Sequence, residues 1–251
     1  CTIAAWVGMN DIADAKASFS EQAVIFQRKH NWIMCVLYTG TFGSFIGFSA
    51  GFPLLAKTAF PAINSLQFVF LGPLVGALSR AWTGWIADKY GGARVTVWVF
   101  VGMILAALGV LYFLSAGSFI GFFAMFMLLF FFTGVGNSST FQMIPNIVSD
   151  YIPKLAPGLT PEETRRSVAR ESAAITAFTS AIAAYGAFFI PKAYGSSIAA
   201  TGKANLALWG FVIFYLICLA ATWYWYDRPG GVLHDIERRK PAPTNPRAQP
   251  A

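Results

Sequence analysis

The sequence predicts an all-α membrane protein that crosses the bilayer with six helices. Of its 251 residues, 56% are hydrophobic and only 12% are charged, which is more apolar than a soluble domain of this length. Apolar runs of about 20 residues recur along the chain, and a helix of that length spans the roughly 30 Å of hydrocarbon in a bilayer. The formal net charge of +7 is spread over the loops between these runs. It therefore indicates membrane topology rather than a nucleic-acid partner.

Six segments are expected to span the membrane, at residues 32–55, 66–87, 95–114, 118–148, 167–190 and 205–226. The fourth would be roughly 46 Å long at about 1.5 Å per residue, so it should tilt, bend or project beyond the lipid. Residues 1–31 are expected to hold the end of a preceding helix and a cytoplasmic linker, because the chain starts without Met in an apolar stretch. Residues 227–251 are basic and Pro-rich, which predicts a disordered cytoplasmic tail.

The distribution of cations predicts the orientation of the spans. Of the 18 Lys and Arg residues, 14 lie on the side that holds both ends of the chain. Only Lys57, Lys192 and Lys203 lie in loops on the opposite side. Because positively charged loops stay in the cytoplasm, both ends of the chain are expected to be cytoplasmic. This orientation requires an even number of spans, and six fits.

The sequence gives no support for an enzyme, a metal site or a cofactor. Cys1, Cys35 and Cys218 have no paired spacing and no suitable His neighbour, so they are expected to be packing residues. Neither His30 nor His234 lies in an expected span, and no nucleophile stands in a catalytic pattern.

Arg80 is a cation about 14 residues inside the second expected span. A guanidinium does not lose its proton, so its insertion cost of at least about 3 kcal/mol must be met by water, a cavity or an anion. No Asp or Glu lies in the core of any expected span to pair with it. The alternative is an arginine that reaches the interface or bonds to helix carbonyls. Helical spacing predicts that it faces the bundle interior with small residues, namely Gly72, Gly76, Ala77, Thr83 and Gly84.

An aromatic and hydroxyl stripe is expected on the first span. Its residues recur at spacings of three and four, and they are Tyr38, Thr41, Phe42, Phe45 and Ser49. Ordinary core packing is the alternative interpretation. Beside an unpaired arginine, however, aromatic walls suit a flat and weakly hydrated anion.

The fourth span contains a break of small and polar residues, T-G-V-G-N-S-S-T, from Thr133 to Thr140. Gly134 and Gly136 would allow close helix approach, and Asn137 places an amide at membrane depth, where it is a candidate ligand-binding residue. The alternative is a purely structural helix crossing. The fifth span carries a weaker version of the same signal in Thr176, Thr179, Ser180 and Tyr185.

The loop between the second and third spans has the pattern Gly84-x-x-x-Asp88-Lys89-x-Gly91-Gly92-x-Arg94. Its adjacent glycines permit a tight cytoplasmic turn. We expect Asp88 and the cations Lys89 and Arg94 to form ion pairs that hold one gating conformation and break in the other. The alternative is a plain solvated turn.

This loop resembles the loop motif of the major facilitator superfamily, which follows the second helix of each six-helix half. Four further stretches are similar to the NarK-type nitrate/nitrite porters of that superfamily: T-G-T-F-G-S-F-I-G-F-S-A-G-F at 39–52, G-A-L-S-R at 76–80, T-G-V-G-N-S-S-T-F-Q-M-I-P at 133–145 and F-F-I-P-K-A-Y-G-S-S at 188–197. The resemblance covers about residues 6–226. It implies the C-terminal six-helix half of such a fold, in a bacterial inner membrane.

The family's substrate is held between one arginine from each half and clamped by aromatic rings. By resemblance, Arg80 is the arginine of the C-terminal half, Tyr38 and Phe42 line the site, and Ser180 is the hydroxyl of the eleventh helix. The family's glycine three residues before this serine is here Ala177. The N-terminal six helices and the partner arginine are expected on a missing half.

The resemblance implies transport of nitrate and nitrite, with this chain supplying half of the site. The lack of a carboxylate in the span cores favours nitrate/nitrite exchange over proton symport. Symport of nitrate with a proton and transport of another small anion remain alternatives. A membrane scaffold without transport activity is the alternative from a different class.

Overall fold

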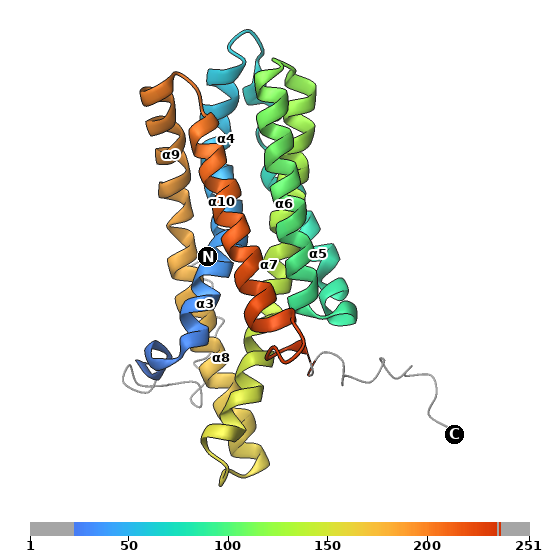
Figure 1. Cartoon of the computed structure of the whole chain (residues 1–251), viewed down its shortest axis with the longest axis vertical. Helices are drawn as coiled ribbons and strands as arrows, with labels where there is room; N and C mark the ends of the chain where they lie inside the picture. Colours follow the sequence, from blue (N-terminus) through green and yellow to red (C-terminus); the bar gives the residue numbers. More distant parts are fainter. Residues whose placement is uncertain (1–22, 235, 237–251) are drawn as a thin grey trace, which may run out of the picture.

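In the computed structural model, residues 23–234 and 236 are described, and they form helices joined by short turns (Figure 1). Six helical rods run side by side along the long axis of this part of the chain, which confirms the predicted all-α architecture. A short 3₁₀ helix, η2 (Ala23–Gln27), precedes the first rod, and another, η4 (Ser65–Phe68), precedes the second. The rods are α3 (Lys29–Tyr38) continued by η3 (Thr39–Gly43) and α4 (Ser44–Ala59), α5 (Leu71–Tyr90), α6 (Gly92–Ser115), α7 (Phe119–Leu155), α8 (Pro161–Ala184) continued by α9 (Gly186–Thr201), and α10 (Asn205–Thr222) continued by η5 (Trp223–Asp227).

Five of the rods are long and apolar enough to cross a membrane. The remaining rod is α5, which carries Arg80, Asp88 and Lys89 and is therefore less apolar. Large aromatic side chains such as Trp82 and Trp98 lie exposed on the outside of the bundle, 73% and 68% accessible. Lipid tails are as apolar as a protein core, so exposed rings on this surface need no further cover.

The helix α7 is 37 residues long, or roughly 55 Å, and it runs without a break through Gly134 and Pro145. Its excess length projects beyond the other rods together with the first turns of α8 (Figure 1). Helix α8 begins earlier than the expected span at residue 167, because Thr160 and Glu163 form a reciprocal capping box around Pro161. These first turns are polar, so apolar periodicity does not detect them.

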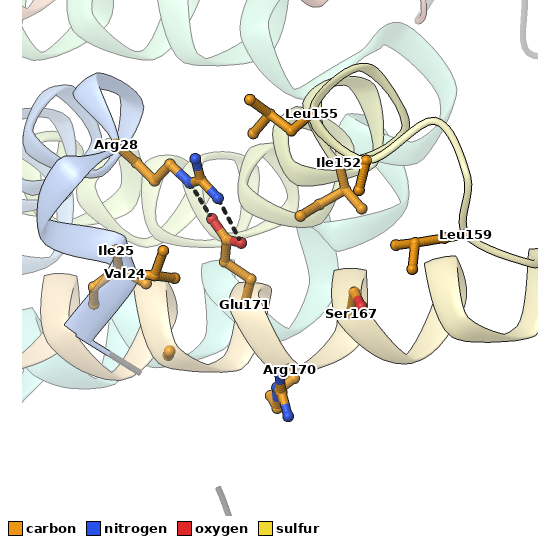
Figure 2. Close-up of a pocket in the computed structure, with 11 residues that line it drawn as sticks. Val24, Ile25, Arg28, Ile152, Leu155, Leu159, Ser167, Arg170 and Glu171 are labelled. Carbon is orange, nitrogen blue, oxygen red and sulfur yellow. Dashed lines mark hydrogen bonds and ion pairs between the residues drawn. The ribbon is translucent and has the colours of Figure 1, made fainter. Parts of the chain in front are cut away.

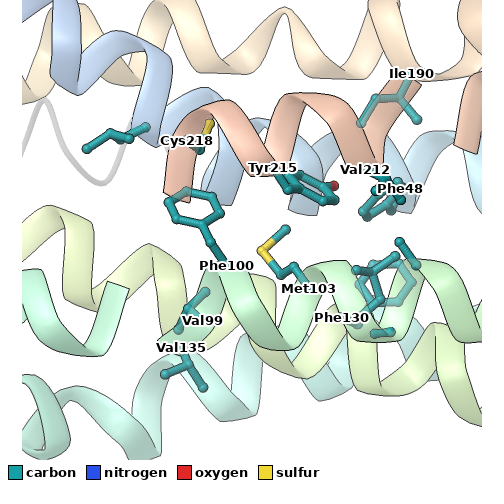
Figure 3. Close-up of a cluster of buried hydrophobic side chains, with 14 of the residues drawn as sticks. Phe48, Val99, Phe100, Met103, Phe130, Val135, Ile190, Val212, Tyr215 and Cys218 are labelled. Carbon is teal, nitrogen blue, oxygen red and sulfur yellow. The ribbon is translucent and has the colours of Figure 1, made fainter. Parts of the chain in front are cut away.

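Phenylalanine rings fill the space between α4 and α7. Phe52 packs on Phe126 with ring centroids 4.6 Å apart, and Phe48 meets the edge of Phe130 at 6.3 Å. Beside them, Phe100 and Met103 of α6 lie opposite Tyr215 of α10 (Figure 3). Close side-chain packing of this kind holds helices together where lipid supplies no hydrophobic drive.

Two glycine contacts bring helix backbones together. A Cβ on Gly134 of α7 would collide with the carbonyl of Gly76 on α5, and the Ser79 hydroxyl donates to the Phe131 carbonyl at 3.1 Å across the same crossing. A Cβ on Gly186 would collide with the Gly43 backbone. The first crossing fixes α5 on α7, and the second fixes η3 against the start of α9.

Candidate functional site

The candidate site lies where η3 interrupts the first rod. A π-helical turn inserts one extra residue into an α-helix, and here it begins directly after Tyr38. The rings of Tyr38 and Phe42 stack with centroids 5.1 Å apart and planes 23° apart. The two aromatic residues that were expected to line a site therefore form one wall.

Tyr38 connects this wall to three other helices. Its hydroxyl donates a hydrogen bond to Oδ1 of Asn137 on α7 at 2.8 Å, and both residues are buried, at 2% and 1% exposure. Ser180 of α8 and Arg80 of α5 both lie near enough to the same phenol to influence it electrostatically. The structure thus brings together all five residues that the sequence suggested for the site.

Arg80 itself is exposed and lines a pocket of about 300 Å³ with Ala77, Ala81, Ser138 and Phe141. Among residues 23–234 and 236, no carboxylate forms an ion pair with it. The positive charge therefore opens onto a surface of the described bundle, where no carboxylate compensates it.

The expected face of α5 needs a correction. The buried stripe of this helix consists of Gly72, Gly76, Ser79, Thr83 and Ala87, and it packs against α7. Arg80 follows Ser79 by one position, about 100° around the helix, so it lies beside that stripe and not on it. The small residues at offsets of four and eight serve the helix crossing, which leaves the arginine free to point away from the core of this half.

The expected stripe on the first span is also wrong in part, because the π-turn changes its register. Thr41 does not join Tyr38 and Phe42 but lies buried against α7, with its hydroxyl 3.1 Å from that of Thr140. Phe45 turns toward Phe130, with centroids 6.3 Å apart. An extra residue in the turn rotates everything that follows it, so a stripe drawn at α-helical spacing cannot stay on one face.

The polar break in α7 divides into two kinds of residue. Ser139 shares a buried hydrogen bond of 2.8 Å with Thr96 of α6, and Thr140 bonds to its own helix as well as to Thr41. These hydroxyls join helices. Asn137 instead bonds to an aromatic residue of the candidate site, and Gly136 is packed against Thr41 and Val99.

The loop between α5 and α6 turns at Gly91, whose φ of 92° lies in the left-handed region that favours glycine. Asp88 accepts a hydrogen bond from the Gln142 amide of α7, and Arg94 lies 3.9 Å from Asp227 of η5. In this conformation Asp88 therefore bonds to Gln142 and not to Lys89 or Arg94, and the expected gating pairs stay a prediction. Gln142 and Asp227 were not predicted, since a single amide within a helix or a single carboxylate at a helix end gives no distinctive sequence signal.

A second charged cluster lies at the end of the bundle that holds the start of α3 (Figure 2). Arg28 bonds to Glu171 through Nε at 2.8 Å and through Nη2 at 3.4 Å, and the Tyr151 hydroxyl donates to the same carboxylate. The hydrogen bond and charge of Glu171 raise the pKa of Arg28. Glu171 is only 9% exposed. Glu171 lies near the start of the fifth expected span and outside the span core, where no carboxylate was expected.

The close approach expected near Ser180 occurs elsewhere. Ala177 is exposed, whereas Gly43 and Gly186 carry the tight contact between the first and fifth rods. The repeated small residues Gly43, Gly47 and Gly51 are a signal that could have identified one side of this contact. Within the part of the chain that the structure describes, no group of three His, Cys, Asp or Glu side chains could hold a metal ion.

Known proteins that are similar in sequence to this chain include nitrate/nitrite transporters. The chain is 48% identical over 235 residues to the nitrate/nitrite transporter NarU of Salmonella typhimurium, covering 90% of this chain and 50% of that protein. It is 38% identical over 233 residues to the probable nitrate/nitrite antiporter NarK2 of Thermus thermophilus, covering 90% and 48%. A nitrite extrusion protein of Bacillus subtilis is 26% identical over 224 residues. The chain spans about half the length of the curated relatives it matches.

A family model independently covers most of the chain. Residues 8–191 match the Major Facilitator Superfamily, a family of membrane transporters and not of enzymes. The match includes the loop at Asp88 and Gly91 and every residue of the candidate site. Together with the six helical rods, it shows that this multi-pass membrane chain belongs to the Major Facilitator Superfamily.

Proposed function

We propose that this chain supplies the C-terminal half of a nitrate/nitrite transporter and that Arg80 is its anion-binding cation. The observation that carries the proposal is the position of Arg80: a permanent positive charge in a membrane rod, exposed beside Tyr38 and without a counter-ion among the described residues. Such a charge is costly in a bilayer unless water or an anion compensates it. A transported anion is a partner that fits.

The chemistry of nitrate and nitrite suits these side chains. Both anions are small, planar and weakly hydrated, and a guanidinium presents a planar fork of donors that can bind two oxygens at once. The stacked rings of Tyr38 and Phe42 offer a flat wall next to that fork. The names of the relatives support the same substrate class.

The exposure of Arg80 supports a second half as a partner. Transporters of this architecture place their substrate between two six-helix halves that rock around a shared site. The chain covers about half of its relatives, and its charged pocket opens outward between α5 and α7. We therefore propose that an N-terminal six-helix half covers this surface and contributes the partner arginine.

The orientation follows from the charges in the turns. The turn at Gly91, the turn between α7 and α8, and the start of α3 lie at the same end of the bundle (Figure 1). These segments carry most of the loop cations, so this end is the cytoplasmic one under the positive-inside rule. In a bacterial inner membrane, both ends of the chain would then be cytoplasmic.

We favour nitrate/nitrite exchange over symport with a proton. A proton carrier needs an accessible carboxylate or histidine along the anion path. Glu171 is buried among the described residues, but Arg28 and Tyr151 occupy its oxygens, and it lies with the cytoplasmic cluster. The alternatives of proton symport and of another small anion are distinguished by transport assays.

The test is substitution of Arg80 by lysine in the complete transporter. Arg80→Lys keeps the charge but loses the planar fork, so nitrate uptake into proteoliposomes should fall at least about 100-fold. Arg165→Lys is a matched control, because that arginine is exposed near the start of α8 and its ion pair among the described residues is with Glu162. Near-normal uptake by Arg80→Lys would reject the proposed role, whereas loss of uptake in both variants would indicate a general defect.

A further inference from the structure

The hydrogen bond between Tyr38 and Asn137 has a direction that matters for an anion site. A phenol has a single proton to donate, and here the Tyr38 hydroxyl donates it to Oδ1 of Asn137 at 2.8 Å. Both side chains are almost completely buried. The proton is therefore held on the side of α7 in the absence of an anion.

Nitrate and nitrite accept hydrogen bonds and donate none. While Asn137 holds the phenolic proton, Tyr38 presents only the lone pairs of its oxygen to its remaining neighbours, Arg80 and Ser180. Those lone pairs can satisfy a guanidinium or a serine hydroxyl, but they repel an anion. The site thus contains a potential donor that is withheld from the substrate.

Asn137 and Tyr38 are both almost completely buried in this half, and the pocket beside Arg80 is lined on α7 by Ser138 and Phe141. Of the two buried residues, Tyr38 is the one with Arg80 as an electrostatic neighbour. Ser139 and Thr140 bond to other helices, so Asn137 is the residue of the polar break that bonds to Tyr38. Its route to the anion is therefore through the Tyr38 hydroxyl.

We propose that Asn137 is a positioning residue that sets the anion affinity by retaining the Tyr38 proton, a role that rests on the proposed transport function. A transporter needs its substrate to bind and then to leave, so a withheld donor keeps the bound state from becoming too stable. This role replaces the direct contact between Asn137 and the substrate that the sequence suggested.

A double-mutant cycle separates this role from simple packing. In the complete transporter, Asn137→Leu removes the acceptor and leaves the buried phenol without a partner until an anion arrives. The KM for nitrate exchange should then fall about fivefold, and the maximal rate should fall as release slows. In the Tyr38→Phe background, Asn137→Leu should change neither value, because there is no proton left to redirect.

Two further variants keep the experiment decisive. Asn137→Ala removes the same acceptor with a smaller side chain and should move KM in the same direction if Asn137→Leu fails to fold. Ser139→Ala is the matched control. It removes a buried hydroxyl two residues along α7, and that hydroxyl bonds to Thr96 and not to Tyr38. It should leave KM unchanged.

A rise in KM, an unchanged KM, or an equal effect of Asn137→Leu in both backgrounds would overturn the proposal. Failure of the transport function itself has a different signature, namely no nitrate exchange by the unsubstituted protein. In that case the thermal unfolding midpoints of the four proteins in the cycle still test the coupling. These are the unsubstituted protein, Asn137→Leu, Tyr38→Phe and the double variant. Additive midpoint shifts would show that Tyr38 and Asn137 do not act as a pair.

Discussion

Arg28 and Arg80 are two arginines of one bundle in opposite environments. Arg28 lies at the end of the bundle that holds the start of α3, where Glu171 accepts its hydrogen bonds and Tyr151 lies under its guanidinium at 5.2 Å. Arg80 lies within a membrane rod, exposed and without a carboxylate partner among the described residues. One charge is compensated by a carboxylate, and the other has no carboxylate partner among the described residues.

This difference distinguishes a charge that stabilises the fold from a charge that is available to a ligand. A buried charge that has lost its partner is strongly destabilising, so an internal pair such as Arg28 with Glu171 must remain intact for the fold. An uncompensated cation contributes little to the fold and is available to a ligand. Substitution at the two sites is therefore expected to change different quantities: the unfolding free energy at Arg28 and the transport rate at Arg80.

The largest expected effect tests whether Arg80 needs the second half. The purified 251-residue chain, reconstituted without any other polypeptide, should show no saturable nitrate exchange, because alternating access requires two halves around a shared site. Uptake of labelled nitrate into proteoliposomes measures this directly, with the complete transporter as the positive control. Saturable exchange by the chain alone would show that Arg80 works without a partner half.

The next effect tests the compensated site. Glu171→Gln should lower the unfolding free energy by about 2 kcal/mol, since it leaves the Arg28 charge in place and removes its counter-ion from a largely buried position. Arg80→Gln should leave the midpoint of thermal or denaturant unfolding unchanged. Glu162→Gln, in an exposed ion pair at the start of α8, serves as the control. Equal destabilisation by Glu171→Gln and Arg80→Gln would remove the distinction between the two arginines.

Sequence patterns predicted one of these sites better than the other. Arg80 stands out because a cation inside an apolar run is rare, and its detection needs no knowledge of contacts. The ion pair of Arg28 with Glu171 joins residues 143 positions apart, so only the folded chain brings them together. The same limit applies to Asp88 with Gln142 and to Arg94 with Asp227.

The number of rods and their apolar character were also predictable, whereas the local register was not. Apolar runs of membrane length directly indicate helices. The π-turn at Thr39–Gly43 has no comparable signal, yet it changes the register of the first rod where Tyr38 and Phe42 stack and Thr41 and Phe45 contact α7. A single inserted residue thus separates the side chains of the candidate site from those of the core.

The smallest expected effect concerns coupling to protons, and it also follows from the comparison. Closing an empty site would strip water from Arg80 with nothing to offset the loss, whereas a bound monoanion compensates the charge and lets the halves move. Uptake of external nitrate should therefore require nitrate or nitrite inside the vesicle. The one carboxylate that is buried among the described residues, Glu171, is engaged by Arg28 and is not free to carry a proton.

An imposed pH gradient should consequently change nitrate uptake by less than about twofold in vesicles preloaded with nitrite. The measurement compares acid-outside, alkaline-outside and symmetric vesicles at equal internal nitrite, with Glu171→Gln as a parallel variant. Strong uptake into anion-free vesicles driven by a proton gradient would contradict exchange. If Glu171→Gln abolished that uptake, the cluster of Arg28, Glu171 and Tyr151 would take part in transport, and the separation between the compensated and the uncompensated arginine would no longer hold.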